Sequence, residues 1–185
     1  MHRDGFRARG EWTRVLQGSV LKTGVFKTYK ERGEWVEAQF IAEALRRGYK
    51  VLRPWGDSRP FDVAIYFGKR IVRVQVKSTT YRVSTGYRCD LKPSPRSEPY
   101  SLKQLDFFAA YIIPEGVWYL LPARALVSGD RLKKGPMLCP MQPLKINRYR
   151  YEGYKEAWEV LRPRRRGEGS VKNPACPPAR DRPPL

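Results

Sequence analysis

The chain has 185 residues, and its 37 lysines and arginines against 18 aspartates and glutamates give a formal net charge of +19. A hydrophobic content of 41%, including 12% aromatic residues, suits one globular domain and excludes a chain that is disordered throughout. The excess positive charge predicts an anionic partner, and nucleic acid is a stronger candidate than a membrane surface.

No segment of the sequence resembles a membrane anchor or an export signal. The longest apolar run, 107–113, is far shorter than the roughly 20 residues that a spanning helix needs. The first thirty residues contain several arginines but no apolar stretch of the kind found in secretory signals. We therefore expect a cytoplasmic protein that has no membrane partner.

The numbers of cysteines and histidines also limit which catalytic mechanisms and metal sites are available to the chain. The cysteines at 89, 139 and 176 are scattered and form no C-x-x-C pair, which argues against a disulfide framework or a structural zinc site. The one histidine is His2, so schemes that need histidine as general base or metal ligand are excluded. Catalysis would have to depend on carboxylates, amides, lysines and a hard cation.

We expect three parts along the chain: a basic N-terminal arm at 1–29, a single domain at 30–161 and a disordered Arg/Pro-rich tail at 162–185. The domain begins with a helix predicted at 33–47, in which apolar residues, Leu45 among them, recur at helical spacing. Gly48 is the expected end of this helix.

The remaining elements alternate between strands and turns, and one more helix closes the domain. Expected strands lie at 49–52, 61–67, 71–78, 107–113 and 117–121; the segment 81–91 extends the sheet; an amphipathic helix ends at 161. Gly68 and Lys69 form the turn of a hairpin between the second and third of these strands. The predicted fold class is α/β (α+β), with a mixed β-sheet flanked by helices.

The predicted hairpin brings three polar side chains together. A two-residue turn at Gly68 and Lys69 sets Asp62 directly opposite Gln75, and Lys77, two residues further on, points to the same face. The other face is apolar. Asp62, Gln75 and Lys77 are therefore expected to converge at one edge of the hairpin.

A fourth candidate comes from the helix. Glu37 lies in the middle of the apolar stripe of the predicted helix, where a carboxylate needs a partner because burial of an isolated charge is costly. Glu34 falls near the edge of the same stripe and is the second choice, whereas Glu43 falls outside it.

These residues form an ordered set of short motifs that resembles the PD-(D/E)xK nuclease superfamily. The motifs are GEWVE at 33–37, GYKV at 48–51, PFD at 60–62 and VQVK at 74–77. The helix motif is similar to archaeal Holliday-junction resolvases. The Gln-x-Lys motif, with 105–109 and 119–122 after it, is similar to intron-encoded homing endonucleases. The resemblance covers residues 30–122 and implies a restriction-endonuclease-like core.

The resemblance implies metal-dependent hydrolysis of a DNA phosphodiester by water. Asp62 would bind Mg²⁺ with the Gln75 side chain and a backbone carbonyl near Val76, and Glu37 would contribute directly or through water; Mn²⁺ is expected to substitute. Lys77 would position the nucleophile and stabilise the developing negative charge. Gln75 stands where an acid is usual, which predicts weaker metal binding.

Each residue also has a simpler interpretation. Asp62 alone suits a turn, Glu37 could pair with an arginine, and Lys77 could protect a strand edge. Arg73 shares the face of Asp62 and is either a DNA contact or a cross-strand charge partner. Three further cations flank the site and are expected to contact DNA phosphates: Lys30, Arg32 and Arg82.

Three functions remain open at this stage. The first is a Mg²⁺-dependent DNA endonuclease, for which the resemblance implies a homo-oligomer, because superfamily members that cut both strands often act as dimers or tetramers. The second is a non-catalytic nucleic-acid-binding protein on the same fold, with Gln75 marking a lost or weakened metal site. The third is an RNA-associated protein whose basic arms bind and whose domain serves as a scaffold.

Overall fold

The fold is described from a computed structural model, which describes residues 26–56, 59–83, 86–92, 100–128, 131–132, 135–140 and 150–163. The expected N-terminal arm up to residue 25 and the expected tail from residue 164 lie outside the described residues, as does the segment 93–99. Among the described helices, none is both long enough and apolar enough to cross a bilayer.

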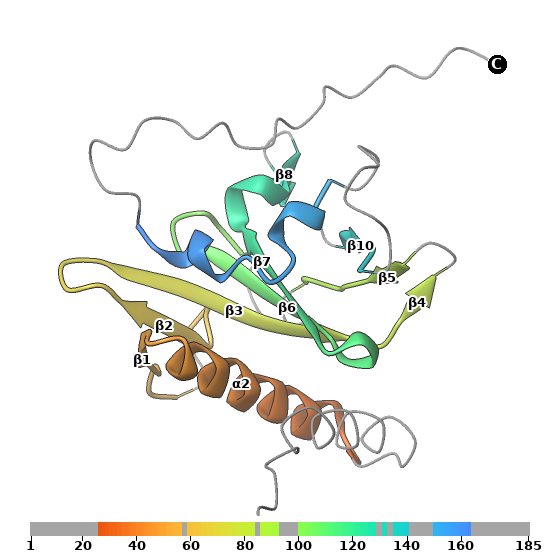
Figure 1. Cartoon of the computed structure of the whole chain (residues 1–185), viewed down its shortest axis with the longest axis horizontal. Coiled ribbons are helices and arrows are strands. Elements are labelled where there is room, and N and C mark those ends of the chain that lie inside the picture. The colour runs from red at the N-terminus through yellow and green to blue at the C-terminus, as the bar shows by residue number, and fades with distance from the viewer. Residues whose placement is uncertain are drawn as a thin grey trace, which may run out of the picture.

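A mixed five-stranded sheet forms the centre of the domain (Figure 1). Its strands are β1 (Lys50–Leu52), β2 (Val63–Tyr66), β3 (Ile71–Thr79), β6 (Phe107–Ile112) and β7 (Val117–Pro122), in the order β1-β2-β3-β6-β7. β3 and β6 are parallel, and all other neighbours are antiparallel. The predicted mixed sheet and α+β class are confirmed.

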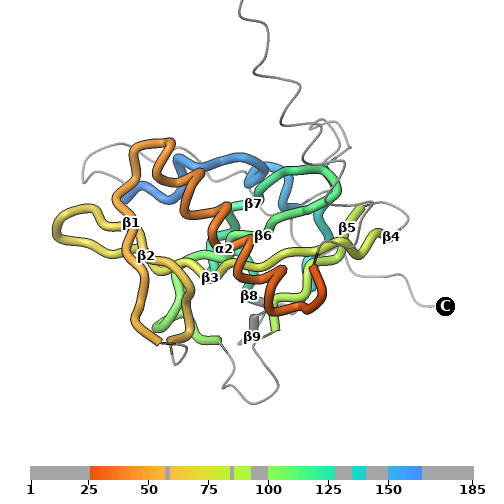
Figure 2. Tube along the Cα trace, turned by 90° about the horizontal axis from the view of Figure 1, so that it is seen from below, coloured from red at the N-terminus to blue at the C-terminus, as the bar shows by residue number. Residues whose placement is uncertain are grey.

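Helix α2 (Tyr29–Arg46) lies along one face of this sheet (Figures 1 and 2). It begins four residues before the predicted start at Gly33, because the Thr28 hydroxyl accepts a hydrogen bond from the Glu31 N–H and caps the first turn. Gly48, with a φ of +79°, stops the helix as predicted. Leu45, expected on the buried face, is 54% exposed.

Two hydrophobic cores form on the two faces of the sheet. Between α2 and the sheet, Phe40 packs against Trp118 and Trp158, with ring centroids 5.4 Å away in each case. On the other face, Phe108 and Tyr119 lie in a second buried cluster. Since alternate residues of a strand point to opposite faces, β6 contributes to both cores.

The segment predicted to extend the main sheet does not do so. Instead, β4 (Arg82–Val83) and β5 (Gly86–Arg88) join β10 (Met137–Leu138) in a separate sheet of the order β10-β5-β4. The chain leaves β3 at Thr79, whose hydroxyl donates to the Arg88 carbonyl and accepts from the Tyr81 N–H. A two-stranded sheet of β8 (Val127–Ser128) and β9 (Arg131–Leu132) completes the described strands.

The prediction of an α-helix that ends at residue 161 is wrong. Two short 3₁₀ helices, η3 (Glu152–Tyr154) and η4 (Trp158–Leu161), stand in its place. Between them, Glu156 has a φ of 51° and forms two hydrogen bonds to Trp118 in β7. The Glu156 N–H donates to the Trp118 carbonyl at 2.8 Å, and the Glu156 carboxylate accepts from the Trp118 N–H at 2.6 Å. These tertiary bonds replace the hydrogen bonds of a continuous helix.

The sheet is flanked by one of the two helices that the sequence predicts. Within the part of the chain that the structure describes, α2 is the one α-helix on the sheet, and the other elements are 3₁₀ turns, including η1 (Ile113–Glu115) and η2 (Ala123–Leu126). The face opposite α2 is covered partly by the β10-β5-β4 sheet, whose residues Tyr87 and Leu138 belong to the second core.

Candidate active site

The β2–β3 hairpin has the register that the sequence predicts. Val63 pairs with Val74, and the Phe67 N–H donates to the Arg70 carbonyl across the turn, at 2.8 Å. One residue before β2, the Asp62 N–H donates to the Val74 carbonyl at 3.1 Å. Asp62 therefore lies opposite Gln75, on the sheet face that points away from α2.

Asp62 and Gln75 are in direct contact. The Asp62 carboxylate oxygen Oδ2 accepts hydrogen bonds from the Gln75 amide at 2.5 Å and from the Val76 N–H at 2.8 Å. Burial raises the pKa of Asp62 above its usual value, although both hydrogen bonds and the charge of Lys77 act in the opposite direction. A carboxylate with this little solvation gains from a nearby cation.

Lys77 lies on the same face as Gln75 and is held from two sides. Its ammonium Nζ donates to the Lys92 carbonyl at 3.1 Å and lies 5.6 Å from the centre of the Tyr100 ring. Burial and the negative charge of Asp62 raise the pKa of Tyr100 to about 12. Tyr100 thus belongs to the site, although it follows the proline-rich segment and gave no signal in the sequence.

Glu37 reaches the site from α2, around the end of the sheet where β2 begins. Its carboxylate pairs with Arg53 at 3.2 Å. Glu37, Arg53 and Asp62 line one cavity of about 650 Å³. The structure therefore brings Glu37 and Asp62 together, with the Arg53 guanidinium, which was not anticipated, between α2 and β2.

The other helix carboxylate does not join them. Glu34, the second choice, is largely exposed, pairs with Lys30 at 3.9 Å and is not among the residues that line the cavity. Glu43 pairs with Arg46 and Arg47 near the end of α2.

Arg73 has the cross-strand partner that one of its two interpretations requires. The Arg73 backbone N–H and guanidinium Nε both donate to one carboxylate oxygen of Asp106, at 2.8 and 2.9 Å, and the guanidinium also bonds the Lys103 carbonyl. This arrangement ties β3 to the start of β6 and favours the role of charge partner.

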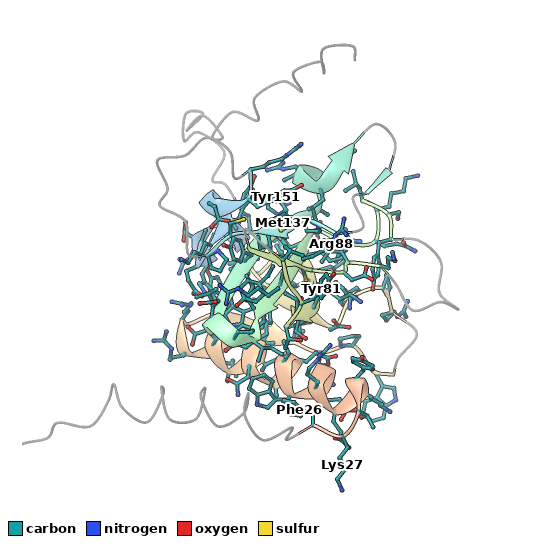
Figure 3. The ribbon with its side chains drawn as sticks, turned by 90° about the vertical axis from the view of Figure 1, so that its right-hand side faces the viewer. Phe26, Lys27, Tyr81, Arg88, Met137 and Tyr151 are labelled. Atoms are coloured by element: carbon teal, nitrogen blue, oxygen red, sulfur yellow. The ribbon has the colours of Figure 1, made fainter. Side chains whose placement is uncertain are left out.

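Arg32 and Arg82 lie far apart in the sequence but line one cavity of about 750 Å³, which we call the basic groove. Its walls come from the first turns of α2, the end of β3 and the β4–β5 hairpin, and include Arg88, Lys92 and residues 78–80. Figure 3 looks onto this end of the molecule, with Tyr81 and Arg88 labelled.

The basic groove has a strong positive bias. Its one acidic lining residue is Asp90, which pairs with Lys92 at 3.6 Å. Among the described residues, no carboxylate lies within ion-pair distance of Arg32, Arg82 or Arg88. The sequence analysis did not identify Arg88 and Lys92 as site residues, because no pattern in the segment 86–92 shows which side chains face α2.

Comparison with known proteins identifies a nuclease family. A family model described as PD-(D/E)XK endonuclease matches residues 27–136, more than half of the chain. The chain belongs to this family. A search of curated proteins gives no match.

Solved structures of two nucleases are similar to this PD-(D/E)XK chain. The bacterial homing endonuclease I-Ssp6803I is 25% identical with a TM-score of 0.59, over 74% of this chain and 92% of its own. The Holliday junction resolvase Hjc of Archaeoglobus fulgidus is 18% identical with a TM-score of 0.39, over 56% of this chain and 80% of its own. The family model and the likeness to the homing endonuclease confirm the suspected superfamily and the restriction-endonuclease-like fold, and they support a DNA endonuclease.

PD-(D/E)XK nucleases generally use divalent metal ions, and the donors at this site suit one. Asp62 and Glu37 supply carboxylates to one cavity, and rotation of the Gln75 amide would turn its oxygen toward a cation at Asp62. This all-oxygen set fits a hard cation. Among the described residues, no three histidine, cysteine or acidic side chains lie close enough together to hold a metal ion.

Proposed function

We propose that this PD-(D/E)XK chain is a Mg²⁺-dependent DNA endonuclease whose site consists of Asp62, Gln75, Glu37 and Lys77. The observation that carries the proposal is the contact of Asp62 with Gln75 on the same strand face as Lys77. Asp62 also lines a cavity together with Glu37. Mn²⁺ would substitute for Mg²⁺, since both prefer oxygen donors.

Each residue has a role that follows from its surroundings. Asp62, Gln75 and Glu37 would hold the cation, which when bound would acidify or orient water and offset charge at the phosphate. Lys77, held by the Lys92 carbonyl, would orient the attacking water and stabilise the negative charge that develops on the phosphate. Arg53 would keep Glu37 turned toward the cavity.

The basic groove would hold the DNA backbone beside this site. Arg32 and Arg82 from the predicted contacts, with Arg88, would bind phosphates, and Lys30 would add charge from the exposed side of α2. The groove lies next to the catalytic lysine, because Lys92 lines the groove and its carbonyl holds Lys77. Arg73, occupied by Asp106, would support the strand and not contact DNA directly.

The nuclease assignment is tested by nicking of supercoiled plasmid in Mg²⁺, Mn²⁺ or EDTA. We expect cleavage with either metal, none in EDTA, and losses of at least a hundredfold for Asp62→Ala and Lys77→Ala. Glu37→Gln should lose activity, whereas Glu34→Gln on the same helix should not, which makes it a matched control. Cleavage by Asp62→Ala at the parent rate would overturn the proposal.

The groove is tested separately by DNA binding in EDTA over a range of salt concentrations. Replacing Arg82 and Arg88 by alanine should weaken binding and make the slope of log K against log salt shallower by about 2, or about one per lost phosphate contact. Replacing Lys50 and Lys69, exposed on β1 and at the β2–β3 turn, removes equal charge elsewhere and should change the slope less.

Gln75 favours a second candidate, a non-catalytic nucleic-acid-binding protein on the same fold. A neutral amide in place of an acid removes one negative charge from the metal site and lowers its affinity for cations. Salt-sensitive DNA binding without cleavage, together with no thermal stabilisation by Mg²⁺ or Mn²⁺, would favour this function. Stabilisation by metal without nicking would instead indicate a strict DNA target.

Cutting both strands of a duplex would need two sites, and we propose a homo-oligomer for that purpose. Sedimentation of the protein with and without DNA tests this part independently of catalysis. A monomer that only nicks would limit the proposal to single-strand cleavage.

A further inference from the structure

Trp55 is the most exposed large hydrophobic residue described, with 99% of its surface accessible. Two other tryptophans, Trp118 and Trp158, are almost completely buried in the core beneath α2. Trp55 instead lines the cavity that contains Glu37 and Asp62. A tryptophan exposed to this degree buries almost no apolar surface within the domain, so its side chain is available for contact with a partner.

The segment that carries Trp55 is restrained at the rim of the cavity. Arg53, two residues before it, pairs with Glu37 on α2. Pro54 restricts the backbone immediately before the tryptophan, and Gly56 has a φ of +77°, which other residues adopt with strain. The indole is therefore carried by a turn that is anchored on one side to the candidate metal site.

The surroundings of Trp55 match a nucleotide better than an apolar protein surface. Arg53 and Arg59 line the same cavity and provide positive charge for a phosphate, while the indole provides a flat face for a base. An apolar partner covering Trp55 would also desolvate these two guanidinium groups, at a considerable cost.

We propose that Trp55 stacks on a base of the substrate next to the phosphate that is cut. The inference rests on the proposed nuclease function and adds the class of substrate. Bases within a regular duplex have both faces covered by their neighbours, so Trp55 would favour DNA that presents an unpaired or unstacked base near the cut. Flaps, gaps and junctions are substrates of this kind.

The test compares binding of a flap or gapped oligonucleotide with binding of a plain duplex of the same length, in EDTA so that no cleavage occurs. Trp55→Ala should weaken binding of the flap or gapped DNA about tenfold or more, and Trp55→Phe should retain most of the affinity, because phenylalanine still stacks. Tyr66→Ala removes another exposed aromatic residue, on β2, and should change neither affinity.

Three outcomes would overturn the inference: unchanged affinity in Trp55→Ala, an equal loss for plain duplex, or a change in oligomeric state on sedimentation that accounts for the loss. The last would make Trp55 a contact between two copies of the chain. Because binding is measured without metal, failure of the nuclease proposal would appear separately, as an absence of nicking in the parent protein.

Discussion

Replacing Gln75 by glutamate restores the usual acid at the site, and the effect should change with metal. In the absence of a cation, the new carboxylate would face Asp62, whose Oδ2 lies 2.5 Å from the Gln75 amide nitrogen. The substitution also removes the hydrogen bond that the amide donates. We therefore expect Gln75→Glu to be less stable than the parent in EDTA.

The distance between residues 62 and 75 determines how much stability Gln75→Glu should lose. Two unit charges about 4 Å apart repel by about 4 kcal/mol at an effective dielectric constant of about 20. Protonating a glutamate with an ordinary pKa at pH 7 costs about as much. Rotation of the new side chain into the cavity relieves part of the repulsion, so we expect a loss of about 2 kcal/mol, which lowers Tm by roughly 4–8 °C.

With a divalent cation bound, Gln75→Glu should become more stable than the parent. The added charge would strengthen metal binding, and each tenfold gain in affinity adds about 1.4 kcal/mol of stability once the metal saturates the site. Thermal melts of parent and variant in EDTA and in millimolar Mg²⁺ measure both effects, with Gln39→Glu on the exposed face of α2 as the control. Equal Tm differences between parent and variant under the two conditions would refute a metal site at Asp62 and Gln75.

Further predictions concern the fold around the site. A Cβ at Gly86 would lie 2.3 Å from a carbonyl oxygen of β10, so Gly86→Ala should lose about 1–3 kcal/mol in urea unfolding, whereas Gly33→Ala, with open space around it, should gain about 0.5–1. Burial raises the pKa of Asp106, but its bonds to Arg73 hold it below its usual value. Its stabilising contribution is therefore present above pH 4 and is lost as pH falls through the folded-state pKa. The stability gap between parent and Asp106→Asn should accordingly be large at pH 7 and close in acid, and a constant gap in denaturant melts would contradict this. Glu152→Ala leaves two buried donors without their acceptor and should cost about 3 kcal/mol, measured by chemical denaturation.

The hairpin that carries the site could be predicted because its determinants are local. Gly68 and Lys69 form the turn, and the alternation of valines with polar residues sets which face is buried, so the register that opposes Asp62 to Gln75 follows from counting. Gly48 likewise ends the helix by its own backbone geometry.

The sequence pattern misled where distant contacts overrule local preference. A helix is suggested by the spacing of Tyr151, Tyr154, Trp158 and Leu161, of which all but Tyr154 are buried. Glu156, however, bonds to β7 and breaks the segment into 3₁₀ turns. The segment after β3 is rich in residues typical of strands, yet the bonds of Thr79 turn it into a separate sheet.

The sequence alone was therefore sufficient to place Asp62, Gln75 and Lys77 on one face of a hairpin, since period-two alternation and a two-residue turn determine that placement. The order of helices and strands was sufficient to predict a mixed sheet. The sequence also indicated Glu37 as a candidate, but it did not indicate which residues surround Glu37. Only the tertiary structure decided that α2 brings Glu37 around the end of the sheet to Arg53 and Asp62, and that Arg32 meets the β4–β5 hairpin to form the basic groove. Such placements depend on how a helix packs across strands that lie far away in the chain, and no local pattern encodes that geometry.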